Sequence, residues 1–345
     1  MQNQPRGYWG ATIEYSSCSG RLGDCNTTIA DYRREIESTK PTMPIRQVEP
    51  EERLVSLEGM YLSHNLQGLA RRVGRPIVVA NYATDLSDVI AVKGARGSPE
   101  KLQSASDWRL FQEVTAQADA IITGASYMSD FGERGESSQN VLTQFDKGSA
   151  FEELGRWRVQ NGLQRSPDIV VLSRSLNFHI PKRISESHRR IIVFTIRTMQ
   201  DSEKARELQR AGATIIGAGR HGVEGAGMVE RLNQEGYGVV KMTTGPRVLR
   251  ILMDAEFRNQ GGEVVRKGAL DRLYITRVDR RIVDDLSSAI TVLEGRKVDD
   301  LGADGGGYRQ IERYVQDKVT TNDGFETSQE FLVYERNEIA NANHD

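Results

Sequence analysis

The sequence has few cysteines and no long apolar segment. Its 345 residues include only two cysteines, Cys18 and Cys25, which lie seven positions apart in a polar stretch without a nearby histidine. This pair makes a poor zinc site, and we expect free thiols rather than a disulfide framework. No run approaches 18 apolar residues, and no charged segment followed by an apolar one opens the chain. We therefore expect no membrane span and no signal peptide, hence a soluble cytoplasmic protein.

An excess of charge of one sign is also lacking. The 46 basic and 48 acidic residues are well mixed and give a formal net charge of -2. No basic stripe is present, and no aromatic residues alternate with arginine and lysine as they do on a base-stacking surface. These absences disfavour nucleic acid as a partner.

Several catalytic and metal-binding patterns are missing. His179, His188 and His221 share no metal-like spacing with one another or with the cysteines, so we expect no metal. No Gly-x-Ser-x-Gly motif occurs, and the glycines of residues 305–307 lack the Lys and Ser/Thr of a phosphate-binding P-loop. The sequence therefore disfavours a metalloenzyme, a serine hydrolase and a P-loop enzyme.

The texture of the chain changes along its length. Residues 1–49 are polar and are expected to be mostly mobile, and residues 50–74 carry leucines at helical spacing that predict a helical extension. Strands and helices then alternate over residues 75–336, before a short tail at 337–345. This alternation predicts an α/β domain with a mostly parallel central sheet and helices on both faces. After Gly262 the strand-like segments lack helices between them, so we expect a late antiparallel element.

Hydrophobic periodicity sets the expected elements of this α/β domain. Strands are expected at Ile77–Asn81, Ala120–Gly124, Asp168–Ser173, Arg190–Thr195, Thr214–Gly217, Gly238–Met242, Leu270–Val278, Ala289–Leu293 and Glu330–Arg336. Helices are expected at Asp107–Ala118, Ala150–Gln160, Asp201–Ala211, Val223–Gln234 and Pro246–Phe257. Gly212 and Gly236 are suited to end the helices that precede them, because glycine adopts the left-handed backbone conformation easily.

A strand–turn–helix pattern at residues 237–257 carries most information about a ligand. Gly245 permits a tight bend, and Pro246 suits the first position of a helix. The free N–H groups of Gly245, Arg247 and Val248 would then face whatever lies beyond the strand end, together with the positive end of the helix dipole. This arrangement predicts a phosphate-binding turn, and hence a nucleotide ligand.

Six groups of motifs occur in the order found in a known family. They are Arg75–Asn81 with Ala83–Ala91, Ala118–Ala125, Val171–Leu176, Ile192–Thr195, Val239–Leu249 and Leu270–Thr276. Together they resemble the reductase domain of riboflavin biosynthesis, the C-terminal domain of the bifunctional deaminase-reductase. The resemblance covers roughly residues 75–336. It implies a three-layer α/β fold similar to dihydrofolate reductase and, because family members commonly pair, a homodimer.

The chain departs from this family at three motifs. The family's Ser-Leu-Asp-Gly turn is here Asp85-Leu86-Ser87-Asp88, and its Glu-Gly-Gly-Pro turn is residues 243–246, Thr-Thr-Gly-Pro, without the acid. Its glycine-rich turn corresponds to Gly124–Ser129, which lacks the arginine that could meet a substrate phosphate. The chain therefore looks like a divergent member whose substrate has room to differ.

The resemblance implies an NADPH-dependent reductase. In the family, hydride is delivered to the sugar-derived carbon of 5-amino-6-(5-phosphoribosylamino)uracil or of 2,5-diamino-6-ribosylaminopyrimidinone phosphate, which opens the ribose to a ribityl chain. We expect such a pyrimidine-ribose phosphate as substrate, or a changed carbonyl or imine compound. The alternative is a non-catalytic nucleotide-binding family member that acts through a partner, and the loss of the family's acid favours it.

The resemblance also implies where the ligands bind. Asp85 or Asp88 is the candidate catalytic acid, and the alternative is that both are solvated turn residues. Asn81, Thr84, Ser87 and Thr243 are expected at the substrate. Cofactor-binding residues are expected at Gly124, Ala125, Ser126, Ser173, Thr195, Gly219, Arg220, Thr244, Gly245, Pro246, Arg247 and Val248.

One further motif matches the dinucleotide-binding fingerprint Gly-x-Gly-x-x-Gly at Gly217–Gly222. In Rossmann domains the motif opens the first strand–helix unit, and an acidic residue ends the following strand. Here the motif comes late, and Lys241 and Thr243 stand where that acid is expected. We therefore favour a glycine-rich loop near the adenosine end of the same cofactor. Arg220 is then either a ligand of a 2′-phosphate or a surface arginine.

Overall fold

The computed structural model describes residues 44–95, 98–134, 142–303 and 306–341. It separates the chain into two units, Met1–Thr42 and Met43–Asp345, and the description concerns the second. The interpretation of residues 1–43, including Cys18 and Cys25, lies outside the described residues.

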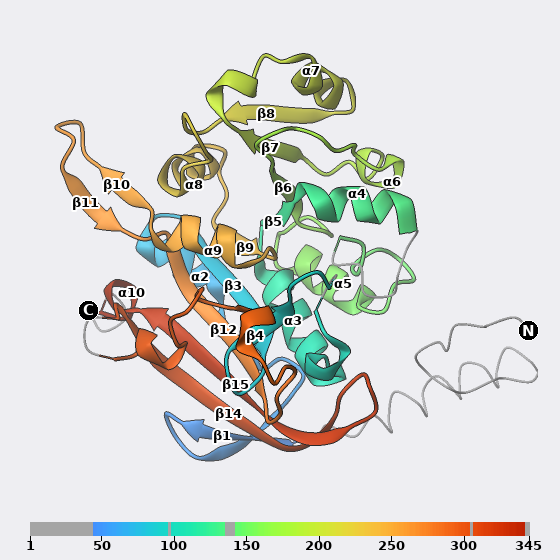
Figure 1. Ribbon diagram of the computed structural model, residues 1–345, viewed down its shortest axis with the longest axis vertical. Helices are drawn as coiled ribbons and strands as arrows, with labels where there is room; N and C mark the ends of the chain where they lie inside the picture. Colours follow the sequence, from blue (N-terminus) through green and yellow to red (C-terminus); the bar gives the residue numbers. More distant parts are fainter. Residues whose placement is uncertain (1–43, 96–97, 135–141, 304–305, 342–345) are drawn as a thin grey trace, which may run out of the picture. The chain divides into compact units, whose positions relative to one another are not determined.

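Among the described residues, one sheet of 11 strands forms the frame (Figure 1). The strands lie in the order β2-β1-β14-β15-β12-β3-β9-β5-β6-β7-β8. From β12 to β8 all neighbours are parallel, and from β2 to β12 all are antiparallel. The bounds are β1 (Pro44–Glu49), β2 (Arg53–Ser56), β3 (Ile77–Thr84), β5 (Ala120–Gly124), β6 (Asp168–Leu172), β7 (Ile191–Thr195), β8 (Ala213–Gly217), β9 (Val239–Met242), β12 (Leu270–Val278), β14 (Tyr308–Thr320) and β15 (Glu326–Arg336). The predicted α/β fold with a mostly parallel sheet and a late antiparallel element is confirmed.

Helices cover both faces of this sheet (Figure 1). The described helices are α2 (Leu66–Val73), α3 (Ala105–Gln117), α4 (Ala125–Arg134), α5 (Glu152–Gln160), α6 (Lys182–Ser185), α7 (Glu203–Arg210), α8 (Gly225–Gln234), α9 (Pro246–Met253) and α10 (Asn337–Asn341). Leucines of α8 and α9 pack with Val78, Ala80 and Val240 on one face. Leucines of α2 and α3 pack with Val79 and Val239 on the other face. Alternate side chains of these strands therefore pack into separate cores on the two faces of the sheet, which gives the three-layer arrangement.

The helix expected over residues 50–74 is wrong in its first half. Arg53–Ser56 forms β2, which pairs with β1 so that Val55 lies opposite Ile45. Gly59 has φ of 85°, and the helix begins only at Leu66. The apolar residues before Gly59 fit a helical spacing, but β1 offers them a strand partner. β1, within the segment expected to be mobile, in turn pairs with β14.

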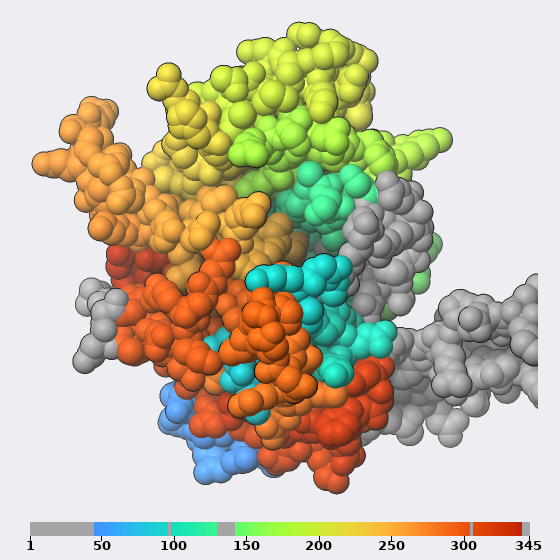
Figure 2. Space-filling model, in the orientation of Figure 1, coloured from blue at the N-terminus to red at the C-terminus, as the bar shows by residue number. Residues whose placement is uncertain are grey.

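Several elements of the structure differ from those expected or were not predicted. The helix expected over 246–257 ends at Met253, because Phe257 pairs with Arg266 in the hairpin β10 (Glu256–Arg258) and β11 (Val264–Lys267). Figure 2 shows this hairpin standing out from the surface. β4 (Val89–Val92) pairs with β13 (Ala289–Thr291), and α4 begins directly after β5. The long strand β14 is the largest omission.

A histidine before α2 fastens this segment to the antiparallel part of the sheet. His64 Nε2 lies 2.8 Å from Glu312 Oε2 of β14. His64 Nδ1 lies 2.9 Å from the Tyr274 hydroxyl of β12. The Tyr314 hydroxyl donates to the same carboxylate at 2.9 Å. His64 therefore joins the segment before α2 to β14 and to β12, two strands that lie far away in the sequence.

Glu312 predicts a stability loss in acid. Burial alone raises the pKa of Glu312, but the hydrogen bond and charge of His64 outweigh it and hold the pKa below its usual value. A carboxyl whose pKa is lower in the folded state stabilises above its unfolded pKa, and this contribution disappears as the pH falls through the folded pKa. Glu312→Gln is therefore expected to unfold at lower urea concentration than the wild type at pH 7, with a difference that narrows below about pH 5.

Urea unfolding at a series of pH values tests this expectation. Glu326→Gln is the control, because Glu326 is exposed and meets only the exposed Lys318; its stability should match the wild type throughout. A Glu312→Gln difference that stays constant from pH 7 to about pH 3 would contradict the role given to its ionisation.

Candidate functional site

The residues predicted to bind ligands gather along one edge of the sheet. β3, β9, β5, β6, β7 and β8 are parallel neighbours, so their carboxyl ends meet at this edge. Asn81 and Thr84 lie at the end of β3, Thr243–Val248 follow β9, Gly124–Ser126 follow β5, Ser173 follows β6, Thr195 ends β7, and Gly219 and Arg220 follow β8. Open parallel sheets bind ligands outside the carboxyl ends of their strands, and this edge is the candidate site.

The turn after β9 is fixed by its neighbours and open above. The Thr243 N–H and hydroxyl donate to the Ile122 carbonyl at 2.9 and 3.0 Å. The Tyr82 hydroxyl donates to the Thr244 carbonyl at 2.9 Å. The Thr244 hydroxyl oxygen is buried and has no partner among the described residues. A Cβ placed on the exposed Gly245 would meet nothing within 4 Å. The backbone is held in place while its outer side stays accessible.

The start of α9 offers hydrogen-bond donors to an anion. Gly245 is the N-cap of this helix, with Pro246 next and no side chain capping the end. The Val248 N–H donates to the Gly245 carbonyl at 3.1 Å, so the expectation that it is free is wrong. The N–H groups of Gly245 and Arg247 have no partner among the described residues. These donors, the open space and the unpaired Thr244 hydroxyl fit a phosphate of a dinucleotide.

Of the neighbouring strand ends, the one after β5 is open and those of β6 and β7 are more closed. α4 begins at Ala125, and a Cβ on Gly124 would meet only the Ser126 hydroxyl at 3.7 Å, so this turn is open too. Ser173 Oγ accepts the Leu176 N–H at 3.0 Å. The buried Thr195 hydroxyl donates to the Arg174 carbonyl at 3.4 Å. The Ser173 and Thr195 hydroxyls therefore shape the loop after β6.

The loop after β8 lies far from the turn after β9. Four strand spacings separate the two strands, about 19 Å in all. Gly219 is buried with φ of 114°, and a Cβ there would clash with the Gly222 carbonyl oxygen. Its own carbonyl accepts the Arg197 N–H at 2.9 Å. The conformation of the loop thus requires Gly219, while Arg220 is exposed.

Asp85 is buried inside the loop after β3. Its Oδ1 accepts the N–H groups of Ser87 at 2.7 Å and Val89 at 3.0 Å. Its Oδ2 accepts the Ile282 N–H at 3.2 Å. Ser87 is half-buried at the same turn. Asp85 therefore holds two loops together and has no accessible carboxylate edge.

Asp88 has a similar position. It adopts φ of 63°, where the resembled family has a glycine. Its Oδ2 accepts the Val298 N–H at 3.0 Å, and its Oδ1 lies 3.3 Å from the Arg277 guanidinium. Asp88 is 2% exposed, so it is a buried turn residue rather than a solvated one. The catalytic role of Asp85 or Asp88 stays a prediction, and these contacts disfavour it.

The predicted substrate residues divide between the two faces. Asn81 follows Val79 in the alternation of β3 and lies on the face covered by α2 and α3. Thr84 lies an odd number of positions after Asn81 in the same strand, so its side chain is on the opposite face of the sheet. Since Ala80 is opposite Met242 in the register of β3 and β9, Thr243 is the neighbour of Asn81. The structure brings Asn81 and Thr243 together, and separates Thr84 from them.

A buried lysine was not predicted as a site residue. Lys241 lies in the apolar strand β9 and is fully buried under α3. Its Nζ donates to the Phe111 carbonyl and to the Thr115 hydroxyl, each at 2.7 Å. Burial lowers the pKa of Lys241 well below its usual value, and Asp107 opposes this in part. A lysine inside an otherwise apolar strand was the signal in the sequence.

Asp107 in the first turn of α3 was also missed. Its N–H donates to Oγ of Ser104, the N-cap of the helix, at 3.1 Å. Burial raises the pKa of Asp107 to about 6, although the Thr276 hydroxyl and the Lys241 charge lower it in part. Thr276 belongs to β12, beside β3. A polar cluster of Asp107, Lys241 and Thr276 thus lies on the same face as Asn81.

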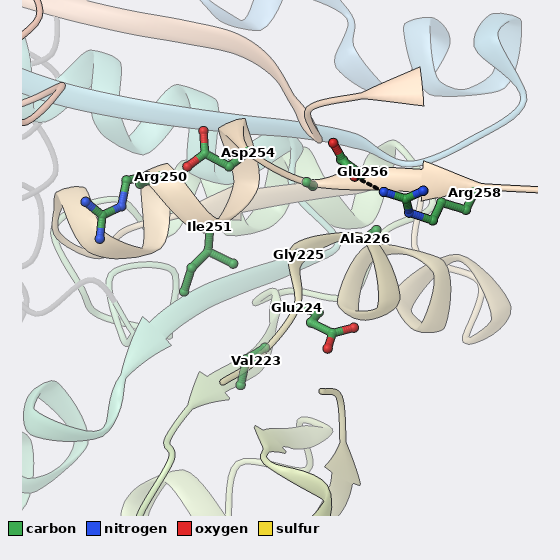
Figure 3. A pocket seen from close by; sticks show the side chains of 10 residues that line it. Val223, Glu224, Gly225, Ala226, Arg250, Ile251, Asp254, Glu256 and Arg258 are labelled. Carbon is green, nitrogen blue, oxygen red and sulfur yellow. Dashed lines mark hydrogen bonds and ion pairs between the residues drawn. The ribbon is translucent and has the colours of Figure 1, made fainter. Parts of the chain in front are cut away.

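A separate cavity of about 430 Å³ lies between the start of α8 and the end of α9 (Figure 3). It contains none of the predicted site residues. An ion pair between Glu256 and Arg258 forms part of its wall. The lining residues are Val223, Glu224, Gly225, Ala226, Arg250, Ile251, Asp254, Ala255, Glu256 and Arg258.

The described residues contain neither a metal-binding cluster nor a membrane-spanning helix. Within these residues, no group of three or more His, Cys, Asp or Glu side chains could hold a metal ion. No helix in the same part of the chain is long and apolar enough to span a bilayer.

Comparison with solved structures finds several reductases. A pyrimidine reductase-like protein from Corynebacterium diphtheriae is 17% identical, with a TM-score of 0.48 over 79% of this chain and 98% of that one. A diaminohydroxyphosphoribosylaminopyrimidine deaminase/5-amino-6-(5-phosphoribosylamino)uracil reductase from Thermotoga maritima is 15% identical, with a TM-score of 0.47 over 76% and 57%. The riboflavin biosynthesis reductase of Saccharomyces cerevisiae is 14% identical, with a TM-score of 0.46 over 80% and 99%.

Comparison of the sequence itself gives a family. No curated protein matches the chain. The model of the RibD C-terminal domain matches residues 76–260, which is more than half of the chain and includes every predicted site residue. This match, rather than the structural likenesses, decides the assignment: the chain belongs to the RibD C-terminal domain family, the reductase-domain family of riboflavin biosynthesis.

Proposed function

We propose that this protein is an NADPH-dependent reductase that acts on a ribosylaminopyrimidine phosphate, or on a carbonyl or imine compound of related shape. The main support is the turn after β9. There Gly245 is open, the N–H groups of Gly245 and Arg247 have no partners in the described part of the chain, and Asn81 lies one strand away. The bound dihydronicotinamide would supply the hydride. A cytoplasmic homodimer is the assembly and location that the family implies.

The protein's own residues would bind and orient the two ligands. The first turn of α9 would hold the pyrophosphate through backbone N–H groups, with the Thr244 hydroxyl beside it. The start of α4 at Gly124–Ser126 would contact the cofactor next to it. Arg220, at the far end of the same edge, would contact a 2′-phosphate. Asn81 and Thr243 would contact the substrate.

A second function is a nucleotide-binding protein without turnover that acts through a partner. The observation that favours it is the engagement of Asp85 and Asp88, whose carboxylates bind backbone N–H groups and Arg277. The absence of an acid from residues 243–246 points the same way. Both functions require NADPH binding, and only the first requires NADPH oxidation.

The site predicts that Gly245→Ala weakens NADPH binding without weakening the fold. Gly245 has φ of -73°, and a Cβ there meets no protein atom within 4 Å, so the melting temperature should be unchanged. A methyl group above the open backbone would keep a phosphate from its N–H donors, and we expect a loss of affinity of about tenfold or more. Arg247→Glu should have a similar effect, because it places a negative charge at the helix N-terminus.

Fluorescence titration with NADPH and NADPH oxidation with the ribosylaminopyrimidine phosphate provide the measurements. Gly227→Ala is the matched control, since a Cβ there also meets nothing within 4 Å and the residue lies in α8. Equal NADPH affinity for wild type, Gly245→Ala and Arg247→Glu would place the cofactor elsewhere. Binding without oxidation would support the second function, and no binding by the wild type would overturn both.

A further inference from the structure

Resting on the proposed reductase function, we propose that the Asp107 carboxyl group is the proton donor of the reduction. It lies on the first turn of α3, above Lys241 and Thr276 and on the face of the sheet that carries Asn81. Neither the sequence motifs nor the contacts of Asp85 and Asp88 provide such a group.

The topology places Asp107 at the candidate site. α3 connects β3 to the parallel strand β5 and so runs against the strands, which brings its first turn to their carboxyl edge. Leu110 and Val114 of α3 pack with Val79 of β3, which fixes the helix over this face. Asn81 continues the alternation of Val79 toward the same edge. Asp107 therefore stands over the end of the sheet where Asn81 and Thr243 are proposed to meet the substrate.

The carboxyl of Asp107 is unlike the other buried carboxyls near this site. Asp85 accepts N–H donors on both oxygens, whereas Asp107 Oδ1 is buried and has no partner among the described residues. The residue as a whole is half-buried, so part of it stays accessible. An unpaired carboxyl oxygen costs free energy in the free protein, and a substrate atom can supply the missing partner.

The surroundings of Asp107 raise the fraction of its protonated form near neutral pH above that of an ordinary aspartate. The titratable groups that face it are Lys241 of β9 and Tyr61 in the segment before α2, and the Thr276 hydroxyl of β12 is its polar neighbour. Lys241 donates to Phe111 and Thr115, and no ion pair joins it to Asp107 in the described part of the chain. Burial raises the pKa of Asp107 to about 6. An acid of this strength keeps its proton in about one molecule in ten at pH 7.

The proposed step balances. A hydride with its two electrons forms a C–H bond at the sugar carbon, and the bond from this carbon to the ring oxygen breaks. The O–H bond of Asp107 breaks, and its proton forms an O–H bond on the released ring oxygen. Water then returns a proton to the carboxylate. The electron donor is the dihydronicotinamide that the proposed function already requires.

Asp107→Asn tests the assignment in single-turnover hydride transfer from pH 5 to pH 8, followed at the nicotinamide absorbance. The wild-type rate should fall about tenfold per pH unit above pH 6, because the protonated form is lost. The variant should be about 10²–10⁴-fold slower and independent of pH, with unchanged NADPH affinity. Asp201→Asn, at an exposed position before α7, is the control and should behave as the wild type.

Infrared titration of the protein without ligands gives a second readout. A protonated-carboxyl band that disappears near pH 6 should be present in the wild type and absent from Asp107→Asn. Thr276→Val should move both this titration and the falling limb of the rate to higher pH, because the hydroxyl lowers the pKa of Asp107. This variant also serves if Asp107→Asn does not fold.

The outcomes separate the two proposals. A wild type that binds NADPH but transfers no hydride overturns the reductase function and, with it, the proton donor. A wild type that transfers hydride while Asp107→Asn keeps the same rate and pH limb overturns only the assignment of Asp107. The assignment of Asp107 is also overturned if the hydride-transfer rate of Thr276→Val begins to fall at the same pH as that of the wild type.

Discussion

Replacing Arg158 by methionine is expected to destabilise the domain by about 3–5 kcal/mol. Arg158 is fully buried in α5. Its guanidinium donates to the carbonyls of Gln164 at 2.7 Å, Ala116 at 2.8 Å and Ala118 at 2.6 Å. Methionine fills the space of the stem but donates nothing. The Ala116 and Ala118 carbonyls at the end of α3 and the Gln164 carbonyl after α5 would then lose this donor.

Urea unfolding measures this loss, and α5 supplies its own control. Arg156 is exposed and pairs only with Glu152 one turn earlier, so Arg156→Met should change stability by less than about 0.5 kcal/mol. A loss for Arg158→Met no larger than that of Arg156→Met would mean that water can replace the guanidinium at these carbonyls.

Asp271→Ala is expected to cost a similar amount, about 3–5 kcal/mol. The fully buried carboxylate of Asp271 accepts both terminal nitrogens of Arg75 at 2.9 and 3.0 Å and the Val78 N–H at 2.9 Å. Its removal leaves a half-buried guanidinium and a buried N–H without an acceptor. It also releases the contact that joins the start of β3 to the start of β12.

A double-mutant cycle with Arg75→Ala separates the charge pair from the bond to Val78. The loss of stability in the double variant should be smaller than the sum of the losses in the two single variants. Each single variant leaves one charge of the pair without its partner, whereas the double variant removes both charges. Asp254→Ala, at an exposed position after α9, should leave stability unchanged. Additive losses in the cycle would show that Arg75 and Asp271 act independently.

The parallel half of the sheet could be predicted because its strands are buried on both faces. Runs such as Ile191–Thr195 and Ala120–Gly124 are mostly apolar, and their bounds match the expected ones closely. The predicted end of α7 is explained by local chemistry too, because Gly212 after this helix has φ of 94°.

The antiparallel half could not be predicted in the same way. β14 mixes charged and apolar residues, and only its pairing with β15 and β1 defines it as a strand. The leucines before Gly59 fit a helix equally well until β1 is known to lie beside them. The pairing of β1 with β14 joins segments that lie far apart in the sequence, and a local pattern contains no information about it.

In the candidate site, too, features set by local sequence could be predicted and features set by distant segments could not. The turn at Gly245 was predictable because glycine and proline at these positions act through the backbone. The burial of Asp85 and the polar cluster around Asp107 were not, since they depend on which loop or helix covers the strand ends. Resemblance to a family therefore predicts the backbone conformation of a site more readily than the identity of its acidic residue.

The order of strands in the sheet has a consequence for synthesis of the protein. β1 and β3 leave the ribosome early, yet β1 waits for β14 and β3 waits for β12. Until residues 270–336 have been made, both strands keep an unpaired edge that is open to other chains. Nascent or truncated chains that end before β12 should therefore depend on chaperones far more than the finished protein does.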